Sequence, residues 1–153
     1  MVKHLKFFSI ASIVLLLDQI VKFFVRTRLD SEIRFNDFFA ITYVKNTGAG
    51  FGILQGQTFF LILVSILAVG LIIYYYLKSE SGYIIPLALI LGGALGNMVD
   101  RIFLGFVVDF FNFSFWPAFN IADSALSIGV ILIAVNLFKG RSDKTQDGTN
   151  EGQ

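Results

Sequence analysis

Four apolar segments, each about as long as a bilayer-spanning helix, constrain this chain more than any other feature of its sequence. A helix needs about 20 apolar residues to cross the hydrocarbon core of a membrane. Segments of that kind cover residues 5–25, 58–77, 84–104 and 121–138. Hydrophobic residues make up 56% of the chain and charged residues only 15%, which excludes an ordinary soluble domain. The sequence predicts a single integral membrane domain over residues 1–153, mainly α, with four transmembrane helices.

Several kinds of site are excluded by composition. The chain has no Cys, so it can form neither a disulfide nor a thiol nucleophile, and its one His is His4, near the N-terminus. This argues against a His-based metal site or a Ser-His pair in the core. We expect no metal and no other cofactor. The formal net charge of +1 gives no sign of a nucleic-acid partner.

The polar stretches predict a β element and a disordered tail. Within residues 26–57, apolar side chains fall on alternate positions, as in a half-buried strand: Ile33, Phe35, Phe39, Ile41 and Tyr43. We therefore expect a small β element outside the bilayer between the first and second helices, with a turn at Asn36–Asp37. The glycines of residues 45–52 predict a tight loop. The polar composition of residues 139–153 predicts disorder.

The acids of the membrane region cluster at one end of the predicted helices. Basic residues gather at the other ends of the spans and mark that side as cytoplasmic: Lys3, Lys6, Lys78, Lys139, Arg141 and Lys144. Four spans then place both termini in the cytoplasm. With this topology Asp18, Asp100, Asp109 and Asp123 all lie toward the outer face of the membrane.

Asp109 and Asp123 lie in the stretch from Val107 to Ser124, which is otherwise largely apolar and aromatic. An ionised carboxylate in such surroundings is costly unless it is paired or hydrogen-bonded, and two close together do not easily both stay charged. A pair that shares one proton supplies a base and an acid at the same site. The two residues are therefore candidates for an aspartic catalytic pair.

Structural roles would also explain these residues. Asp123 follows Asn120 by three positions, as in the capping box of a helix. Asp18 and Lys22 are four residues apart and can pair on one helix face, and Asp100 could pair with the adjacent Arg101. Ser124 with Lys22 is a rival nucleophile and base.

Five motifs in one order resemble the lipoprotein signal peptidase family, the prolipoprotein signal peptidase II of bacteria. They cover nearly the whole chain: Asp18-Gln19 with Lys22, NTGAGFG at residues 46–52, GGALGNMVDR at 92–101, VVDFF at 107–111 and FNIADS at 119–124. Two positions depart from the family pattern, since Gly50 stands where Ala is more usual and Asn112 where an acid often follows VVDF. Neither departure touches Asp109 or Asp123.

The resemblance implies a membrane aspartic endopeptidase that cuts prolipoprotein signal peptides just before a diacylglyceryl-modified Cys, near the outer face of the bacterial cytoplasmic membrane. It places the catalytic role on Asp109 and Asp123. It also implies supporting or substrate-binding positions around them: Asn46, Asn97, Arg101, Asn120, Asp18, Lys22 and Asp100. The expected partners are lipidated prolipoproteins and membrane phospholipid, and we expect a monomer.

Two functions of other classes are compatible with clustered acids in a membrane protein. A metal-dependent lipid phosphotransferase could bind magnesium through them, and sensitivity to a chelator would identify it. A small proton-coupled transporter would need acids accessible from both faces of the membrane, and dependence on a proton gradient would identify that function.

Overall fold

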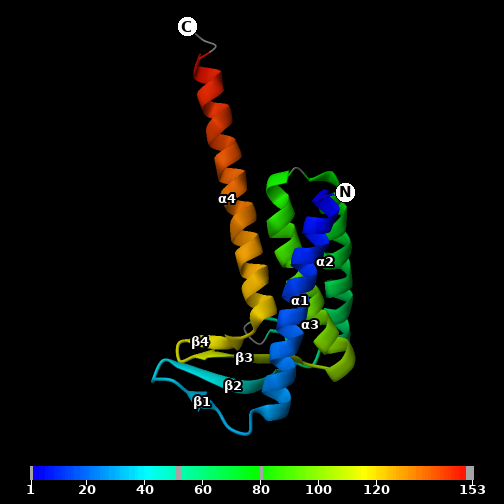
Figure 1. The fold of residues 1–153 in the computed structure, drawn as a ribbon, viewed down its shortest axis with the longest axis vertical. Coiled ribbons are helices and arrows are strands. Elements are labelled where there is room, and N and C mark those ends of the chain that lie inside the picture. Colours follow the sequence, from blue (N-terminus) through cyan, green and yellow to red (C-terminus); the bar gives the residue numbers. More distant parts are fainter. Residues whose placement is uncertain (1, 51–52, 80, 151–153) are drawn as a thin grey trace.

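A computed structural model describes residues 2–50, 53–79 and 81–150, and for residues 140–150 it describes the backbone alone. Four long helices run through this part of the chain (Figure 1): α1 (Val2–Arg28), α2 (Thr58–Lys78), α3 (Ile84–Leu104) and α4 (Ile121–Asn150). A short 3-10 turn, η2 (Ser81–Tyr83), precedes α3. All four helices include a segment long and apolar enough to span a membrane, so the prediction of four transmembrane helices is confirmed.

Helix α3 lies at the centre of the bundle and packs against each of the other three. Its sequence allows this because small residues let helices approach closely. A Cβ atom on Gly92 would lie 2.7 Å from the carbonyl oxygen of Ala11 in α1, and one on Gly96 would lie 3.2 Å from the Cβ of Ala122 in α4. The small-residue spacing of Gly92 and Gly96 therefore serves the contacts of α3 with two different helices.

A four-stranded antiparallel sheet lies at one end of the bundle, in the order β1 (Ile33–Arg34), β2 (Phe39–Asn46), β3 (Val107–Phe113) and β4 (Trp116–Phe119). The prediction placed the β element between the first two helices, and β1 and β2 are there. It was incomplete, because the other two strands come from the connection between α3 and α4. That stretch is almost continuously apolar and lacks the alternation that marks a half-buried strand.

The predicted turn at Asn36–Asp37 connects β1 and β2. The side-chain oxygen of Asn36 accepts hydrogen bonds from the backbone N–H groups of Phe38 and Phe39, both at 2.9 Å. Asn commonly closes turns in this way.

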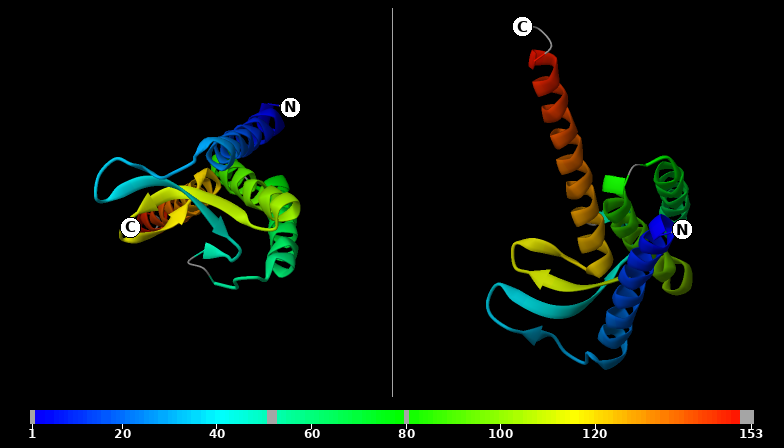
Figure 2. Two further views of the ribbon diagram at one scale, coloured as in Figure 1. Left: turned by 90° about the horizontal axis from the view of Figure 1, so that it is seen from below. Right: turned by 45° about the horizontal axis from the view of Figure 1, so that its top comes forward.

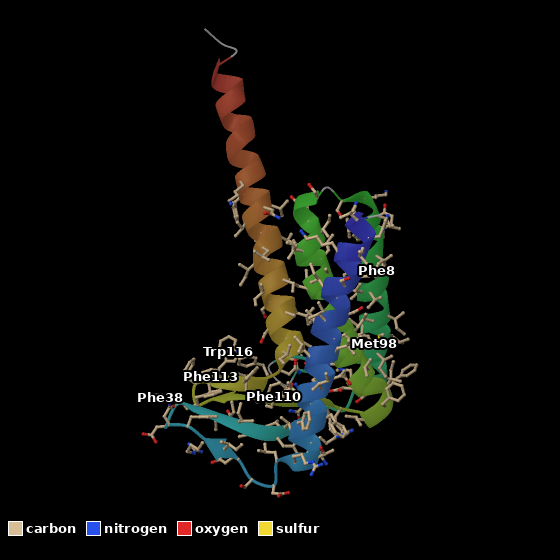
Figure 3. All side chains as sticks on the ribbon, in the orientation of Figure 1. Phe8, Phe38, Met98, Phe110, Phe113 and Trp116 are labelled. Atoms are coloured by element: carbon tan, nitrogen blue, oxygen red, sulfur yellow. The ribbon has the colours of Figure 1, made fainter. Side chains whose placement is uncertain are left out.

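The sheet lies across the end of the helices opposite the two chain termini (Figures 1 and 2). Many of its side chains are aromatic, and Figure 3 shows Phe38, Phe113 and Trp116 around its outer part and Phe110 close to the helices. Val108 and Phe110 of β3 pack against Val25 near the end of α1. This packing fixes β3 against the bundle.

The prediction of disorder for the tail differs from the structure, in which α4 continues to Asn150. The membrane-length part of that helix ends at Lys139. A helix that is already formed gains one backbone hydrogen bond for each residue it adds, so continuation avoids the cost of starting a new helix. Residues 151–153 of the predicted tail lie outside the described residues, as do Phe51 and Gly52 of the glycine-rich loop.

Candidate active site

Asp109 is placed by the turn that follows α3. Helix α3 ends at Leu104 and is capped by Gly105, whose φ of 81° is a left-handed conformation that suits glycine. The chain then enters β3, where alternate residues point to the same face of the strand. Asp109 consequently faces away from Val108 and Phe110, the two β3 residues that pack against α1.

The Asp109 carboxylate is held by two amides. Asn46, the last residue of β2, donates from Nδ2 to Asp109 Oδ2 at 2.9 Å, and Asn120 donates to Asp109 Oδ1 at 2.7 Å. The orientation of the Asn46 amide is set by its other end, because its Oδ1 accepts from the backbone N–H of Gly48 at 2.9 Å. Arg101 in turn donates to the carbonyl oxygen of Gly48 at 3.0 Å.

Asp123 lies in the first turn of α4. The side-chain oxygen of Asn120 accepts from the Asp123 backbone N–H at 2.8 Å, and Asp123 Oδ2 accepts from the Asn120 backbone N–H at 3.2 Å. These reciprocal bonds form the predicted capping box. The cap orients the carboxylate and leaves its Oδ1 free to bond elsewhere.

Two buried amides connect the two acids. Asn97 of α3 donates to Asp123 Oδ1 at 2.8 Å, and its own Oδ1 accepts from Asn120 Nδ2 at 3.1 Å. The same Asn120 amide donates to Asp109. Asp109, Asn120, Asn97 and Asp123 thus form one continuous chain of hydrogen bonds, although they come from β3, the residue before α4, α3 and α4.

A buried ion-pair group, here named the Lys22 cluster, lies beneath this chain and consists of Lys22, Asp18 and Asp100. Lys22 Nζ lies 2.8 Å from Asp18 Oδ2 and 3.1 Å from Asp100 Oδ2, and it donates to Asn97 Oδ1 at 3.0 Å. The predicted pair of Asp18 with Lys22 is confirmed. At most 2% of the surface of each of these three residues is exposed.

The predicted pair of Asp100 with Arg101 was wrong. Adjacent residues on a helix point in different directions, so Asp100 turns toward Lys22 of α1 while Arg101 turns toward the Gly48 loop. The rival pair of Ser124 with Lys22 is not assembled either. The Ser124 hydroxyl donates to the Asn120 carbonyl oxygen, whereas Lys22 is occupied by Asp18, Asp100 and Asn97.

A cavity of about 570 Å³ opens beside Asp123 and is also lined by Asn46 and Asn97, the amides that bind Asp109 and Asp123. Its polar floor includes Asp123, Asn46, Asn97 and Arg101. Its walls include apolar residues of β4 and α4: Trp116, Pro117, Ala118, Phe119, Leu126 and Ile128. Such a cavity suits an extended, mainly apolar ligand with a polar group near the acids.

The two acids have different environments. Only 2% of the surface of Asp109 is exposed, whereas Asp123 is half-buried and lines the cavity. Burial, followed by the nearby charge of Asp123, raises the pKa of Asp109 to about 6. A raised pKa favours the protonated form of the Asp109 carboxyl over its ionised form.

The structure thus brings every predicted site residue into one connected region. Sequence reasoning did not assign a role to Gln19, whose side-chain amide donates to Asp100 Oδ1 and to the Gly96 carbonyl oxygen, both at 3.1 Å. The sequence feature that could have identified Gln19 is an amide side chain within an apolar span, next to Asp18. The walls of the cavity were also missed, because aromatic residues of this kind are equally typical of a core.

Comparison with known proteins identifies the family of this chain. The family model of signal peptidase (SPase) II matches residues 10–139. The chain belongs to the signal peptidase II family. This family is one of aspartic peptidases, so the chain is an enzyme of that type, and the resemblance read from the five sequence motifs is confirmed.

Relatives of this signal peptidase II are similar over nearly their whole length. A lipoprotein signal peptidase of Syntrophus aciditrophicus is 44% identical, with 91% of this chain and 96% of the relative covered. One from Halothermothrix orenii is 40% identical, with 86% and 94% covered. A solved bacterial membrane enzyme superimposes with a TM-score of 0.83 at 36% identity, and 88% of each chain is covered.

Proposed function

We propose that this signal peptidase II removes signal peptides from diacylglyceryl-modified prolipoproteins, cutting before the lipidated Cys, and that Asp109 and Asp123 are its catalytic pair. The observation that carries this proposal is the amide-linked chain between the two carboxylates beside a large, mainly apolar cavity. The named relatives support the choice of substrate, because they are lipoprotein signal peptidases.

In this mechanism Asp123 is the base and Asp109 the acid. Asp123 lines the cavity, where its carboxylate removes a proton from the water that attacks the scissile carbonyl. Asp109, whose pKa is raised to about 6, holds the shared proton, polarises the carbonyl and then protonates the leaving amine. The pair titrates as a unit, because each carboxylate influences the proton affinity of the other.

The residues around the pair keep it in position. Asn46 and Asn120 donate to Asp109, and Asn97 donates to Asp123, so the orientation of both carboxylates is fixed before substrate binds. The apolar cavity walls of β4 and α4 would receive the signal-peptide helix and the acyl chains. Phospholipid surrounds the four spans, and a monomer contains every residue of the site.

The purified enzyme should release the signal peptide from a lipidated preprolipoprotein in detergent, without any ion gradient. We expect the same rate with and without EDTA, because the proposed chemistry uses two carboxylates and water. Gel separation of precursor and product measures the rate. The matched control is the same preprolipoprotein without its diacylglyceryl group, which should be cut far more slowly. A loss of cleavage in EDTA would contradict the proposal and favour metal-dependent chemistry.

We also propose that both termini are cytoplasmic and that the site opens at the outer face of the bacterial cytoplasmic membrane. The start of α1 and the end of α4 both lie on the side of the bundle away from the sheet (Figure 1). The basic residues near that end favour the cytoplasm. Water for the reaction would then come from the outer aqueous boundary rather than from the hydrocarbon core.

A thiol introduced by Asp37→Cys should be labelled in intact cells by a membrane-impermeant reagent, whereas one introduced by Asp147→Cys should not. The native chain has no Cys, so labelling reports the introduced residue alone. Lysed cells supply the control, because both variants should then react. Labelling of Asp147→Cys but not of Asp37→Cys in intact cells would invert the topology and place the site on the cytoplasmic side.

A further inference from the structure

We propose that the Lys22 cluster sets the separation of the two catalytic carboxylates by holding the backbone immediately before each of them. This inference rests on the proposed catalytic pair of Asp109 and Asp123. In the described part of the chain, neither Asp18 nor Asp100 forms a hydrogen bond or an ion pair with the carboxylate of Asp109 or Asp123. Asp18, Lys22 and Asp100 are therefore positioning residues and not catalytic ones.

Asp18 holds the segment that carries Asp123. Its Oδ1 atom accepts a hydrogen bond of 2.9 Å from the backbone N–H of Ala122, the residue just before Asp123. Asp18 is fully buried and so is Ala122. The N–H groups in the first turn of a helix have no partner within that helix, so this bond fixes the start of α4 on α1.

Asp100 holds the segment that carries Asp109 in the same way. Its Oδ2 atom accepts a hydrogen bond of 2.9 Å from the backbone N–H of Val108, the residue just before Asp109. Asp100 lies in α3, and Gln19 of α1 fixes its other oxygen at 3.1 Å. A buried carboxylate with both oxygens bonded has little freedom to move.

The Nζ atom of Lys22 connects the carboxylates of Asp18 and Asp100. This atom lies 2.8 Å from Asp18 and 3.1 Å from Asp100, so both carboxylates are bound to a single ammonium group. The distance between the backbone of Ala122 and that of Val108 is consequently set by a buried ion-pair network. The third bond of Lys22, to Asn97, extends the same control to the amide that binds Asp123.

Control of this kind matters because a shared proton and an attacking water require a fixed separation of the two acids. A misplacement of about 1 Å can lower a catalytic rate by about 100-fold. Substrate binding depends on the cavity walls of β4 and α4 instead, and no residue of the Lys22 cluster lines this cavity. Disturbing the cluster should therefore lower kcat while KM stays nearly constant.

Gly96→Ala tests the inference without changing any polar group. The new Cβ would lie 2.6 Å from Asp18 Oδ2 and 3.2 Å from the Ala122 Cβ, so Asp18 must shift. Gly129→Ala is the matched control, since its Cβ would lie 2.5 Å from Ile90 Cγ1 and 2.8 Å from the Pro86 carbonyl oxygen, away from the site. Both variants make the same chemical change within a helix.

We expect Gly96→Ala to lower kcat on a lipidated preprolipoprotein by about 100-fold with KM changed by less than about twofold. Gly129→Ala should lower the melting temperature in detergent while kcat, measured well below that temperature, stays within about twofold. Equal losses of kcat in the two variants would overturn the inference. So would an increase in KM at unchanged kcat for Gly96→Ala.

A second pair of variants applies if Gly96→Ala does not fold. Asp18→Asn keeps an oxygen that can accept from Ala122, whereas Asp18→Leu has a similar size and none. We expect kcat of the Asn variant to exceed that of the Leu variant by about tenfold. Equal values would overturn the inference. Activity retained by Asp109→Asn or Asp123→Asn would contradict the catalytic pair itself, so the two failures are distinguishable.

Discussion

Asp109→Asn and Asp123→Asn should each lower the rate of signal-peptide cleavage by about 10⁴-fold, to the limit of detection. Each change keeps the size of the side chain and one of its two hydrogen-bond acceptors, but removes its ability to take up and deliver a proton. The loss should appear in kcat, measured with purified, folded enzyme and a lipidated preprolipoprotein. The double variant should be no worse than either single one, because the two acids act as a unit.

Asp37→Asn is the matched control for these variants. It makes the same chemical change in the exposed turn of the sheet, and we expect it to cleave at the wild-type rate. Size-exclusion profiles and membrane insertion should be the same for all three variants. Cleavage near the wild-type rate by either site variant would contradict the catalytic pair.

Lys22→Met should destabilise the enzyme in detergent by about 3–5 kcal/mol, the cost typical of removing one partner from a buried charge group. Met nearly matches the length of the Lys side chain, so packing changes little. Asp18 and Asp100 would lose their shared cation and face one another across an apolar interior. A large fall in the melting temperature, measured by intrinsic fluorescence, would follow.

Lys78→Met provides the matched control, because Lys78 is an exposed residue at the end of α2 that contacts the Tyr74 hydroxyl. An exposed contact of this kind contributes little to stability. We therefore expect its melting temperature to stay near that of the wild type. A similar, small effect of both substitutions would show that the Lys22 cluster does not stabilise the fold.

The helices were predictable because a bilayer sets both the length and the composition of a spanning segment. The predicted span 84–104 coincides with α3, and 58–77 ends one residue before α2 does. The strands β3 and β4 were not predictable in the same way. One face of β3 is buried against the helices and the other carries Asp109, whereas β4 is short and partly exposed, so neither strand shows a regular alternation.

The motifs predicted residues that lie together in the structure, but they did not predict the contacts between those residues. Asp100 was expected to pair with its sequence neighbour Arg101, whereas it pairs with Lys22, which is distant in the chain. Such pairing depends on how α1 and α3 are rotated against each other, and no local pattern specifies that rotation. The role of Gly96 was hidden for the same reason, since its close contact with Asp18 arises only when the two helices pack.

The bond between Asp18 and Ala122 joins positions 104 residues apart in the chain. It connects the first span to the last, and Asp123 itself lies in the first turn of that last span. Under the proposed mechanism, a chain emerging from the ribosome therefore gains its catalytic pair only when its final span has entered the membrane. We expect truncated products that lack α4, and with it Asp123, to be inactive.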